Sequence, residues 1–428
     1  IAFQIDRYFG RQSVIAVADQ YKKEQGRDEA ARDAARGEVS LTESSPIVVM
    51  VRSIIEQAVR QRASDIHFEP MRDGIRIRFR IDGNLVEAMS YDMSIYTAII
   101  ARLKIISGMD ISEKRKPQDG RTTMDIDHVE YDVRVSSIPT VYGEKIVMRL
   151  TNKEKLTRDK RELGLSDDDM KRFDQMLAHP HGIILVTGPT GSGKSTTLYT
   201  ALSELNRETV NIVTVEDPVE ANIDGVNQIQ VNPKADMTFA SALRSILRQD
   251  PDIIMIGEIR DPETAEIAVQ ASITGHLVAS TLHTNSTSAS IARLLNMGIE
   301  PYLMADALVG VVAQRLVRKL CRCKRGREAT AQEKEELGVN QDEVLTIYEP
   351  AGCQLCSQTG YFGRTAVYEM MPVTPELRWA ITKMQPSSKV KEIAQREGMI
   401  TLRGSAVRLV REGVTSLEEM KKIASEED

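Results

Sequence analysis

The chain has 428 residues, a length that allows two or three domains. Of these residues 41% are hydrophobic and 28% are charged, proportions typical of a globular protein. Its formal net charge of −6 argues against a generally basic nucleic-acid-binding protein. No apolar run approaches the ~18 residues that span a membrane, and the first residues lack the apolar core of a signal peptide.

The sequence pattern divides the first 165 residues into three segments. Residues 1–45 combine a short helical stretch with a charge-dense segment at 22–38, and we interpret them as the end of a preceding module followed by a linker. A small α+β domain is expected at 46–150. The charge-rich residues 151–165 predict a linker between this domain and the next.

The elements expected within 46–150 begin with a helix at 48–61. Strict apolar–polar alternation over 75–81, closed by Asp82 and Gly83, predicts a strand that enters a tight hairpin. A second strand pair is expected at 130–135 and 144–150.

From residue 166 onward, short apolar strands alternate with helices. The expected strands lie at 183–187, 211–216, 252–256 and 277–282. This alternation predicts an α/β domain with a mainly parallel sheet and helices on both faces. Beyond residue 372 the chain reads as a helical C-terminal region.

The segment that follows the first of these strands has the G-x-x-x-x-G-K-[ST] spacing of a P-loop. Its glycines let backbone N–H groups converge on phosphates, and the helix that begins near Lys194 adds the positive end of its dipole. Lys194 is expected to contact the β- and γ-phosphates, and the Ser195 hydroxyl to bind Mg²⁺. The sequence therefore predicts binding of a nucleoside triphosphate. The expected contact residues are Gly188, Pro189, Thr190, Gly191, Ser192, Gly193, Lys194, Ser195 and Thr196.

A buried strand at 252–256 leads through Gly257 to Glu258. Such a strand delivers its last residues to the crevice outside the carboxyl ends of the sheet, beside the P-loop. There Glu258 can orient and deprotonate a water for in-line attack on the γ-phosphate. Gly257 stands where many P-loop enzymes carry an aspartate. We therefore expect Mg²⁺ to be held mainly by Ser195, the phosphates and water.

Acids and histidines near two other predicted strand ends are further candidates. Glu216 and Glu220 could bind Mg²⁺-linked water or nucleotide, although acids at strand ends are also common loop residues. His283 follows the strand at 277–282, where the triphosphate is expected, and we interpret it as a γ-phosphate sensor. His276 lies at the other end of the same strand, and a lone histidine is more often structural.

The four cysteines form two pairs about thirty residues apart: Cys321 with Cys323, and Cys353 with Cys356. Paired thiolates at such spacing suit a tetrahedral structural Zn²⁺ site. The first pair has one intervening residue instead of the usual two, so a cluster of reduced thiols without metal is the alternative. A single local cluster also predicts a reducing, cytoplasmic environment.

Arginines alternate along one face of the strand at 75–81, whereas Phe79 points the other way. RNA-binding sheets carry aromatic residues on the binding face, so we expect a solvated or subunit-contacting face instead. Arg134 and Arg149 lie on other strands of the same domain. An arginine supplied by one domain or subunit to the triphosphate of another would stabilise transition-state charge.

Four motifs occur here in the order in which the secretion ATPase superfamily carries them. They are GPTGSGKST at 188–196, VEDPVE at 215–220, LRQDPDIIMIGEIRD at 247–261 and TGHLVASTLHTN at 274–285. With SDIHFEP at 64–70, the cysteine pairs and GVTSLEE at 413–419, the chain over 46–428 resembles type II secretion and type IV pilus assembly ATPases.

The resemblance implies a RecA-like ATPase domain at 166–428, preceded by an N2 domain at 46–150 and the end of an N1 domain within 1–45. It also implies a Cys₄ zinc-binding subdomain at 315–366 and a helical region at 372–428. The implied assembly is a homo-hexamer that clamps ATP between N2 and RecA-like domains. Its implied partners are an inner-membrane platform protein and a cytoplasmic domain of a membrane-anchored protein. The motor would act at the cytoplasmic face of the inner membrane, where ATP hydrolysis would drive pilus or pseudopilus assembly.

By the same resemblance, Lys194 and Ser195 are Walker A residues and Glu258 is the catalytic glutamate. Glu216 and Glu220 correspond to the acids of the family's Asp box, and His276 and His283 fall in its His box. Arg134 and Arg149 fall where the family's N2 domain presents arginines to the nucleotide. Arg244, Arg248 and Arg260 match arginines of the motor core.

Two alternatives of other classes are open at this point. A nucleic-acid motor or DNA-uptake ATPase would use the same core, although the acidic balance and scarce aromatics disfavour it. A nucleotide-gated scaffold without hydrolysis would not need Glu258.

Overall fold

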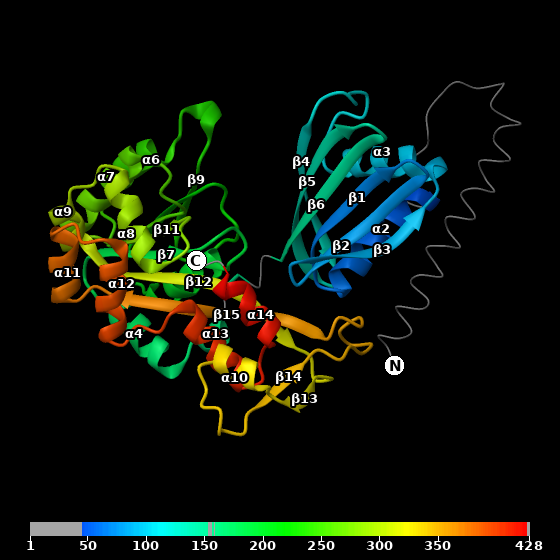
Figure 1. Ribbon diagram of the computed structural model, residues 1–428. Helices are drawn as coiled ribbons and strands as arrows, with labels where there is room; N and C mark the ends of the chain where they lie inside the picture. The colour runs from blue at the N-terminus through cyan, green and yellow to red at the C-terminus, as the bar shows by residue number, and fades with distance from the viewer. Residues whose placement is uncertain (1–44, 153–155, 158, 426–428) are drawn as a thin grey trace, which may run out of the picture. The chain divides into compact units, whose positions relative to one another are not determined.

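The computed structural model describes residues 45–152, 156–157 and 159–425, and it divides into two compact units, residues 1–154 and 155–428 (Figure 1). The interpretation of residues 1–44 as the end of a module and a linker lies outside the described part. Among the described residues, no helix combines the length and the apolar character that crossing a bilayer requires.

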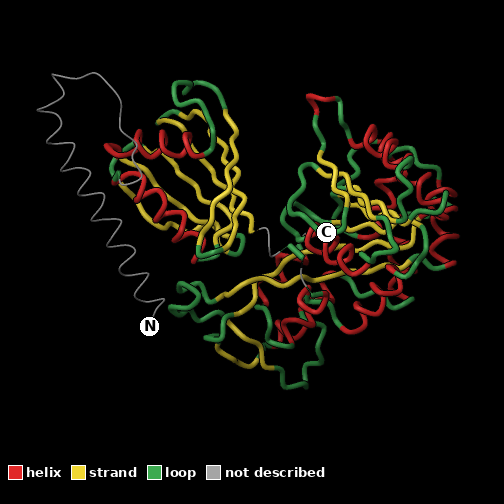
Figure 2. The backbone as a smooth tube through the Cα atoms, turned by 180° about the vertical axis from the view of Figure 1, so that it is seen from behind, coloured by secondary structure: helices red, strands yellow, loops and turns green. Residues whose placement is uncertain are grey.

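Unit 1 is a six-stranded antiparallel sheet with two long helices packed on one face (Figures 1 and 2). The strand order is β3-β2-β1-β6-β5-β4. In chain order the elements are α2 (Pro46–Arg60), β1 (Ala63–Met71), β2 (Gly74–Ile81), β3 (Asn84–Tyr91), η1 (Met93–Ile95), α3 (Tyr96–Ile106), β4 (Gln118–Ile126), β5 (Val129–Thr140) and β6 (Gly143–Asn152).

Side-chain alternation gives this sheet one apolar and one polar face. Ile66, Phe68 and Phe79 are fully buried in the core that α2 and α3 cover. Because successive side chains point to opposite faces, the neighbouring charged residues of β1 and β2 lie on the other face. No helix among the described residues of unit 1 packs on that polar face.

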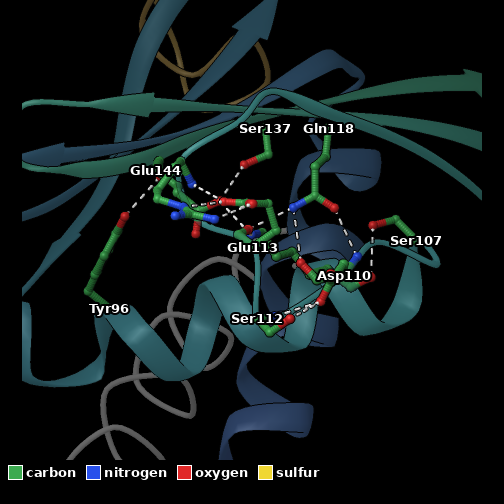
Figure 3. Close-up of polar contacts among 10 residues, drawn as sticks. Tyr96, Ser107, Asp110, Ser112, Glu113, Gln118, Ser137 and Glu144 are labelled. Atoms are coloured by element: carbon green, nitrogen blue, oxygen red, sulfur yellow. Dashed lines mark hydrogen bonds and ion pairs between the residues drawn. The ribbon is translucent and has the colours of Figure 1, made fainter.

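A buried ion pair fixes the segment that follows α3 (Figure 3). The Lys104 Nζ lies 2.5 Å from the Glu144 Oε1 and donates to the Glu113 carbonyl at 2.7 Å. The Ser137 hydroxyl also donates to the Glu144 Oε1, and the Tyr96 hydroxyl donates to the Glu144 carbonyl. These bonds tie the loop between α3 and β4 to the hairpin of β5 and β6.

Unit 2 contains a seven-stranded sheet in the order β15-β12-β7-β11-β10-β8-β9. All neighbouring pairs are parallel except β12 and β15. The predicted α/β fold with a mainly parallel sheet is therefore confirmed. The strands are β7 (Gly182–Thr187), β8 (Ile212–Glu216), β9 (Asn227–Gln230), β10 (Ile253–Ile256), β11 (Leu277–Leu282), β12 (Leu308–Leu320) and β15 (Tyr361–Pro372).

Helices cover both faces of this sheet, as the alternation predicts. One core contains α4 (Asp167–Leu177) and α5 (Lys194–Leu205), and η3 (Lys160–Leu163) lies beside them. The other core contains α6 (Phe239–Ile246), α7 (Pro262–Ile273), α8 (Thr287–Asn296), α9 (Pro301–Ala307), α11 (Pro375–Thr382) and α12 (Ser387–Arg396). The short η4 (Pro233–Ala235) follows β9.

The far ends of β12 and β15 carry a smaller core of their own. The hairpin of β13 (Arg325–Glu328) and β14 (Thr346–Glu349) packs there with α10 (Ala331–Glu336), α13 (Leu402–Arg411) and α14 (Leu417–Ala424). The cysteine-rich segment and the helical C-terminal region thus belong to one body with the P-loop sheet.

Candidate active site

The P-loop connects the fully buried strand β7 to helix α5. Gly188 has φ +149°, and a Cβ there would lie 2.5 Å from the Gln314 carbonyl oxygen of β12. Gly193 has φ +92°, and a Cβ would lie 2.8 Å from the Gln314 Nε2. Both positions therefore need glycine for conformation and for space. The loop wraps closely against β12, and its backbone can turn inward as phosphate binding requires.

Lys194 is the first residue of α5, and its ammonium group folds back onto the loop. It donates to the Gly188 carbonyl at 2.8 Å and to the Pro189 carbonyl at 3.1 Å. Burial lowers the pKa of Lys194; the charge of Glu258 opposes this shift, and the charge of Arg315 adds to it. The lysine thus shares the electrostatic environment of the acid at the end of β10.

Glu258 follows β10 by two residues and lies between two cationic or ionisable groups. The Arg260 Nη2 lies 2.5 Å from its Oε1, and the His283 Nε2 lies 3.4 Å from its Oε2. Burial alone would raise the pKa of Glu258. The hydrogen bond and charge of Arg260, with His283 and Lys194, outweigh burial and lower that pKa below its ordinary value. These contacts favour the ionised form of the carboxylate.

Two connections that the sequence did not reveal hold the loop after β11 against the end of β7 and against β12. Thr187, the last residue of β7, accepts the Thr284 backbone N–H at 3.0 Å on its hydroxyl oxygen. The buried Arg315 of β12 donates to the Asn285 carbonyl and side-chain oxygens, each at 3.2 Å. A threonine at a strand end and an arginine within an apolar strand are weak signals, because their partners lie far away in sequence.

A small pocket adjoins the outer side of the P-loop. It holds about 220 Å³ and is also lined by Arg315 of β12 and by Glu419 and Lys422 of α14. Ser192 contributes a buried hydroxyl oxygen with no hydrogen-bond partner among the described residues. The C-terminal helix therefore lies next to the phosphate-binding loop.

Glu216 is turned into the interior and away from solvent. It accepts from the hydroxyls of Tyr199, on α5, and Thr214, the latter at 2.6 Å, and from the Gln228 Nε2 at 3.0 Å. The Tyr199 hydroxyl oxygen in turn accepts the Glu220 backbone N–H at 3.1 Å. Both oxygens of the Glu216 carboxylate thus have protein partners.

The structure separates the two histidines. His283 contacts Glu258, as described above, whereas His276 precedes β11 at its amino end. The His276 Nδ1 lies 2.8 Å from the Ala271 carbonyl oxygen, at the end of α7. Of the two, only His283 lies with the P-loop and Glu258.

Strand registers place five charged residues of unit 1 in a single line across its sheet. From β2 to β4 the line reads Arg80, Asp65, Arg149, Arg134 and Arg121. Its four arginines, Arg80, Arg149, Arg134 and Arg121, are called the arginine row below. Arg134 and Arg149 were predicted to reach a triphosphate and Arg80 to lie among the alternating arginines of its strand, but the register that joins them to Arg121 depends on pairing between distant strands.

The arginines of β2 do not form a freely solvated face. Arg78 donates to Glu69 from Nε at 2.8 Å and from Nη2 at 2.7 Å, and Arg76 donates from Nε at 3.2 Å. Burial would raise the pKa of Glu69, but the hydrogen bonds and charges of Arg78 and Lys145 lower it to about 2. The expectation of a solvated or subunit-contacting face missed this acid on the neighbouring strand.

The four cysteines converge between the end of β12 and the loop that precedes β15. Their sulfur atoms all lie within 4.8 Å of one another. The Sγ–Sγ distances are 3.7 Å for Cys321–Cys353, 3.9 Å for Cys323–Cys356 and 3.7 Å for Cys353–Cys356. Four sulfurs at ~2.3 Å from a tetrahedral Zn²⁺ would be about 3.8 Å apart. The cluster therefore has the dimensions of a Cys₄ zinc site, despite the short first pair.

Comparison with known proteins gives one consistent result. A family model described as type II/IV secretion system protein matches residues 40–422. The type II secretion system ATPase E of Vibrio cholerae is 46% identical over 385 residues, which is 90% of this chain and 76% of that protein. The type IV pilus assembly ATPase PilB of Myxococcus xanthus is 49% identical over 383 residues, 88% of this chain and 68% of that protein.

Solved structures are similar in fold. The Legionella pneumophila ATPase DotB has a TM-score of 0.66 at 21% identity, covering 91% of this chain and 98% of that one. The pilus retraction motor PilT, solved with bound ADP, has a TM-score of 0.58 at 25% identity, covering 86% and 95% of the two chains.

Proposed function

The chain belongs to the type II/IV secretion system protein family, and we propose that its ATPase powers the assembly of a pilus or pseudopilus. Hydrolysis of ATP is the activity common to its named relatives. The observation that supports the site assignment is the contact of Glu258 with His283 beside the strand that leads into the P-loop, where the charge of Glu258 also acts on Lys194.

In the proposed reaction, the P-loop amides and Lys194 bind the triphosphate, and Glu258 accepts the proton of the attacking water. Mg²⁺ bound to the phosphates would neutralise the charge that develops on them, and we assign the Ser195 hydroxyl to hold it. His283 contacts the same glutamate and is suited to sense the γ-phosphate. Arg260 lowers the pKa of Glu258.

Glu216, Glu220 and His276 have smaller proposed parts. Glu216 is kept as a candidate for Mg²⁺-linked water, and because its carboxylate bonds Tyr199 of α5, we also assign it the role of fixing that helix. Glu220 is retained as a candidate for Mg²⁺-linked water. His276 remains a candidate only through its place in the motif, because it lies at the opposite end of β11 from Glu258.

We further propose that the motor is a homo-hexamer, in which Arg134 and Arg149 reach a triphosphate held by a P-loop. Its partners would be an inner-membrane platform protein and a cytoplasmic domain of a membrane-anchored protein, at the cytoplasmic face of that membrane. The named relatives act in secretion and pilus assembly, which supports these partners. The exposure of the Arg149 side chain, which is 60% accessible, and the place of Arg134 directly opposite it support the arginine assignment.

The cysteine cluster is proposed to hold one structural Zn²⁺. Its sulfur–sulfur distances support this assignment. The ion would tie the end of β12 to the loop before β15 and so stabilise the small core around α13 and α14.

The deciding experiment compares ATPase turnover of the wild type, Glu258→Gln and the control Glu208→Gln across protein concentration, with particle size measured in parallel. Glu208 is an exposed glutamate after α5. We expect Glu258→Gln to lose at least ~100-fold in kcat, as removal of a general base does, while still binding ATP. Glu208→Gln should match the wild type, and turnover should rise as larger assemblies form.

Three results would contradict the proposal. Equal turnover of Glu258→Gln and wild type would favour a nucleotide-gated scaffold. ATP turnover that does not depend on protein concentration would contradict the proposed hexameric motor. Stimulation that grows with DNA length would favour a nucleic-acid motor.

A further inference from the structure

Two buried aspartates lie among the arginines that cross the sheet of unit 1. The Asp132 side chain, on β5, is 1% exposed, and the Asp65 side chain, on β1, is 8% exposed. The arginines that they contact are far more accessible. Arg121 is 50% exposed and Arg149 is 60% exposed. The acids therefore lie at the base of this polar face, and the guanidinium groups reach toward solvent.

Asp132 accepts hydrogen bonds from two neighbouring arginines, and each of them donates from its Nε. Its Oδ1 accepts from the Arg121 Nε at 2.5 Å, and its Oδ2 accepts from the Arg134 Nε at 3.3 Å. One oxygen of the Asp132 carboxylate thus contacts an arginine of β4, and the other contacts an arginine of its own strand, β5.

Asp65 repeats this arrangement on the other half of the line. Its Oδ1 accepts from the Arg149 Nε at 3.1 Å, and its Oδ2 lies 3.6 Å from the Arg80 Nε. Its Oδ2 also accepts from the Ser64 hydroxyl at 2.7 Å. All four members of the arginine row are therefore held through Nε by a buried aspartate.

Holding an arginine through Nε leaves the two outer nitrogens of its planar fork at the far end of the side chain. The outer nitrogens of Arg121 and Arg149 have no other partner among the described residues. Each aspartate thus holds one arginine whose outer nitrogens are open to a ligand. A phosphate group is the ligand that such a fork binds with two parallel hydrogen bonds.

The acids also remove a repulsion that would otherwise disorder the arginine row. Neighbouring strands are ~4.8 Å apart, and like charges directly opposite each other on a sheet are destabilising. Arg134 stands opposite both Arg149 and Arg121. Free arginines would spread apart, and each would lose rotamer entropy when a ligand ordered it.

We propose that Asp65 and Asp132 are positioning residues, which hold Arg149, Arg134 and Arg121 of the arginine row ready to engage the phosphates of ATP in the transition state. This inference rests on the proposed function, and it adds Arg121 to the arginines that would reach the nucleotide. The aspartates act through the arginines and do not touch the substrate.

The test measures kcat and KM for ATP, together with thermal stability, for Asp132→Asn and Asp65→Asn. Asparagine keeps the shape of the side chain but removes the charge and one of the two acceptor oxygens. We expect kcat to fall about tenfold or more, because misplaced catalytic groups are costly, while KM changes by less than about threefold. The melting temperature should stay within about 4 °C of the wild type, a loss of ~1 kcal/mol or less.

The matched control is Asp127→Asn. Asp127 also contacts an arginine through Nε, since the Arg60 Nε lies 3.3 Å from its Oδ2, but Arg60 belongs to α2 and not to the arginine row. Its φ of +54° suits asparagine as well as aspartate. This variant should keep both the kcat and the KM of the wild type.

A double-mutant cycle separates positioning from a merely structural role. If Asp132 acts through its two arginines, Asp132→Asn should change kcat by less than about twofold once both carry Arg→Ala substitutions, Arg121→Ala and Arg134→Ala. If Asp132→Asn lowered kcat by the same factor with and without the two arginine substitutions, the proposal would be overturned.

Glu258→Gln in the same assay distinguishes failure of this inference from failure of the proposed function. Turnover retained by Glu258→Gln would overturn the proposed function, and the inference with it. An inactive Glu258→Gln, combined with aspartate variants that match Asp127→Asn, would overturn the positioning role alone. Loss of folding in both aspartate variants would also overturn it, because the acids would then serve stability.

Discussion

Arg134 of β5 and Arg149 of β6 stand directly opposite each other in an antiparallel register, although both carry positive charge. Such a pair is unfavourable unless nearby acids compensate it, and each arginine has its own aspartate, Asp132 for Arg134 and Asp65 for Arg149. Unit 1 therefore places two positive charges side by side and compensates each of them with a buried acid.

From this relationship we expect Arg149→Ala to lower ATP turnover by at least ~10-fold, because an arginine that stabilises transition-state charge is worth that much or more. Stability should change by less than ~1 kcal/mol, since the side chain is largely exposed and its loss relieves the repulsion from Arg134. Steady-state kinetics and thermal unfolding of the same preparation check both points. If Arg149→Ala assembled normally and kept the ATP turnover of the wild type, Arg149 would not be one of the residues that contact the triphosphate.

The contact between Arg260 and Glu258 leads to a pH-dependent prediction. Arg260 lowers the pKa of Glu258, so its removal should raise that pKa toward the ordinary value. A base with a higher pKa is protonated at higher pH, and the acid limb of the kcat profile should therefore move to higher pH in Arg260→Ala. Arg207→Ala, at an exposed arginine after α5, should leave the limb in place. A limb that does not move would mean that Glu258 is not the titrating base.

The buried pair of Lys104 and Glu144 predicts a large loss of stability when one partner is removed. Lys104→Met should cost about 3–5 kcal/mol, because it leaves the Glu144 carboxylate buried without its cation. Lys104→Met combined with Glu144→Leu should recover much of this loss. Lys114→Met, at an exposed lysine of the same loop, is the control for the substitution itself. A double variant as unstable as the single one would assign the loss to the bonds with Glu113 and Ser137 instead.

Metal removal tests the cysteine cluster. We expect one zinc per chain by elemental analysis, and a lower melting temperature after a strong chelator, because binding of a structural ion stabilises the folded state. Cys323→Ser should abolish the stoichiometric zinc and reproduce the chelator effect without the chelator. Full stability of a zinc-free wild type would leave the cluster as four reduced thiols.

Local signals predicted much of the site. The strand before the P-loop, the helix that begins at Lys194 and the acid after β10 all follow from contiguous patterns, because each depends on backbone periodicity or glycine conformation within a few residues. The start of α7 was predictable for the same reason. Asp261 caps that helix by accepting the Thr264 N–H at 2.8 Å.

Pairing between distant strands was not predictable in this way. Arg149 meets Asp65, 84 residues earlier, only because β6 lies beside β1 in one particular register. The hydrogen bond between the Glu216 carboxylate and the Tyr199 hydroxyl was not predictable either, because the place of Glu216 at a strand end does not show which way its side chain points. Single-sequence reasoning therefore found the groups that lie along one element and missed those that only the sheet brings together.

The buried acid Glu69 predicts how stability responds to low pH. Its pKa is lowered to about 2, against an ordinary value near 4.5, so it favours the folded state above pH 4.5, and this contribution is lost as the pH falls toward 2. A shift of that size corresponds to roughly 3 kcal/mol. Glu69→Gln should therefore be less stable than the wild type at pH 7, and this difference in stability should narrow between pH 4.5 and pH 3.

The control is Glu56→Gln, which removes an exposed ion pair with Arg52 and whose stability should not converge with that of the wild type at low pH. Calorimetric scans of the three proteins across this range make the comparison. A gap between wild type and Glu69→Gln that stays constant with pH would show that Arg78 and Lys145 do not set the protonation of Glu69 in the folded protein.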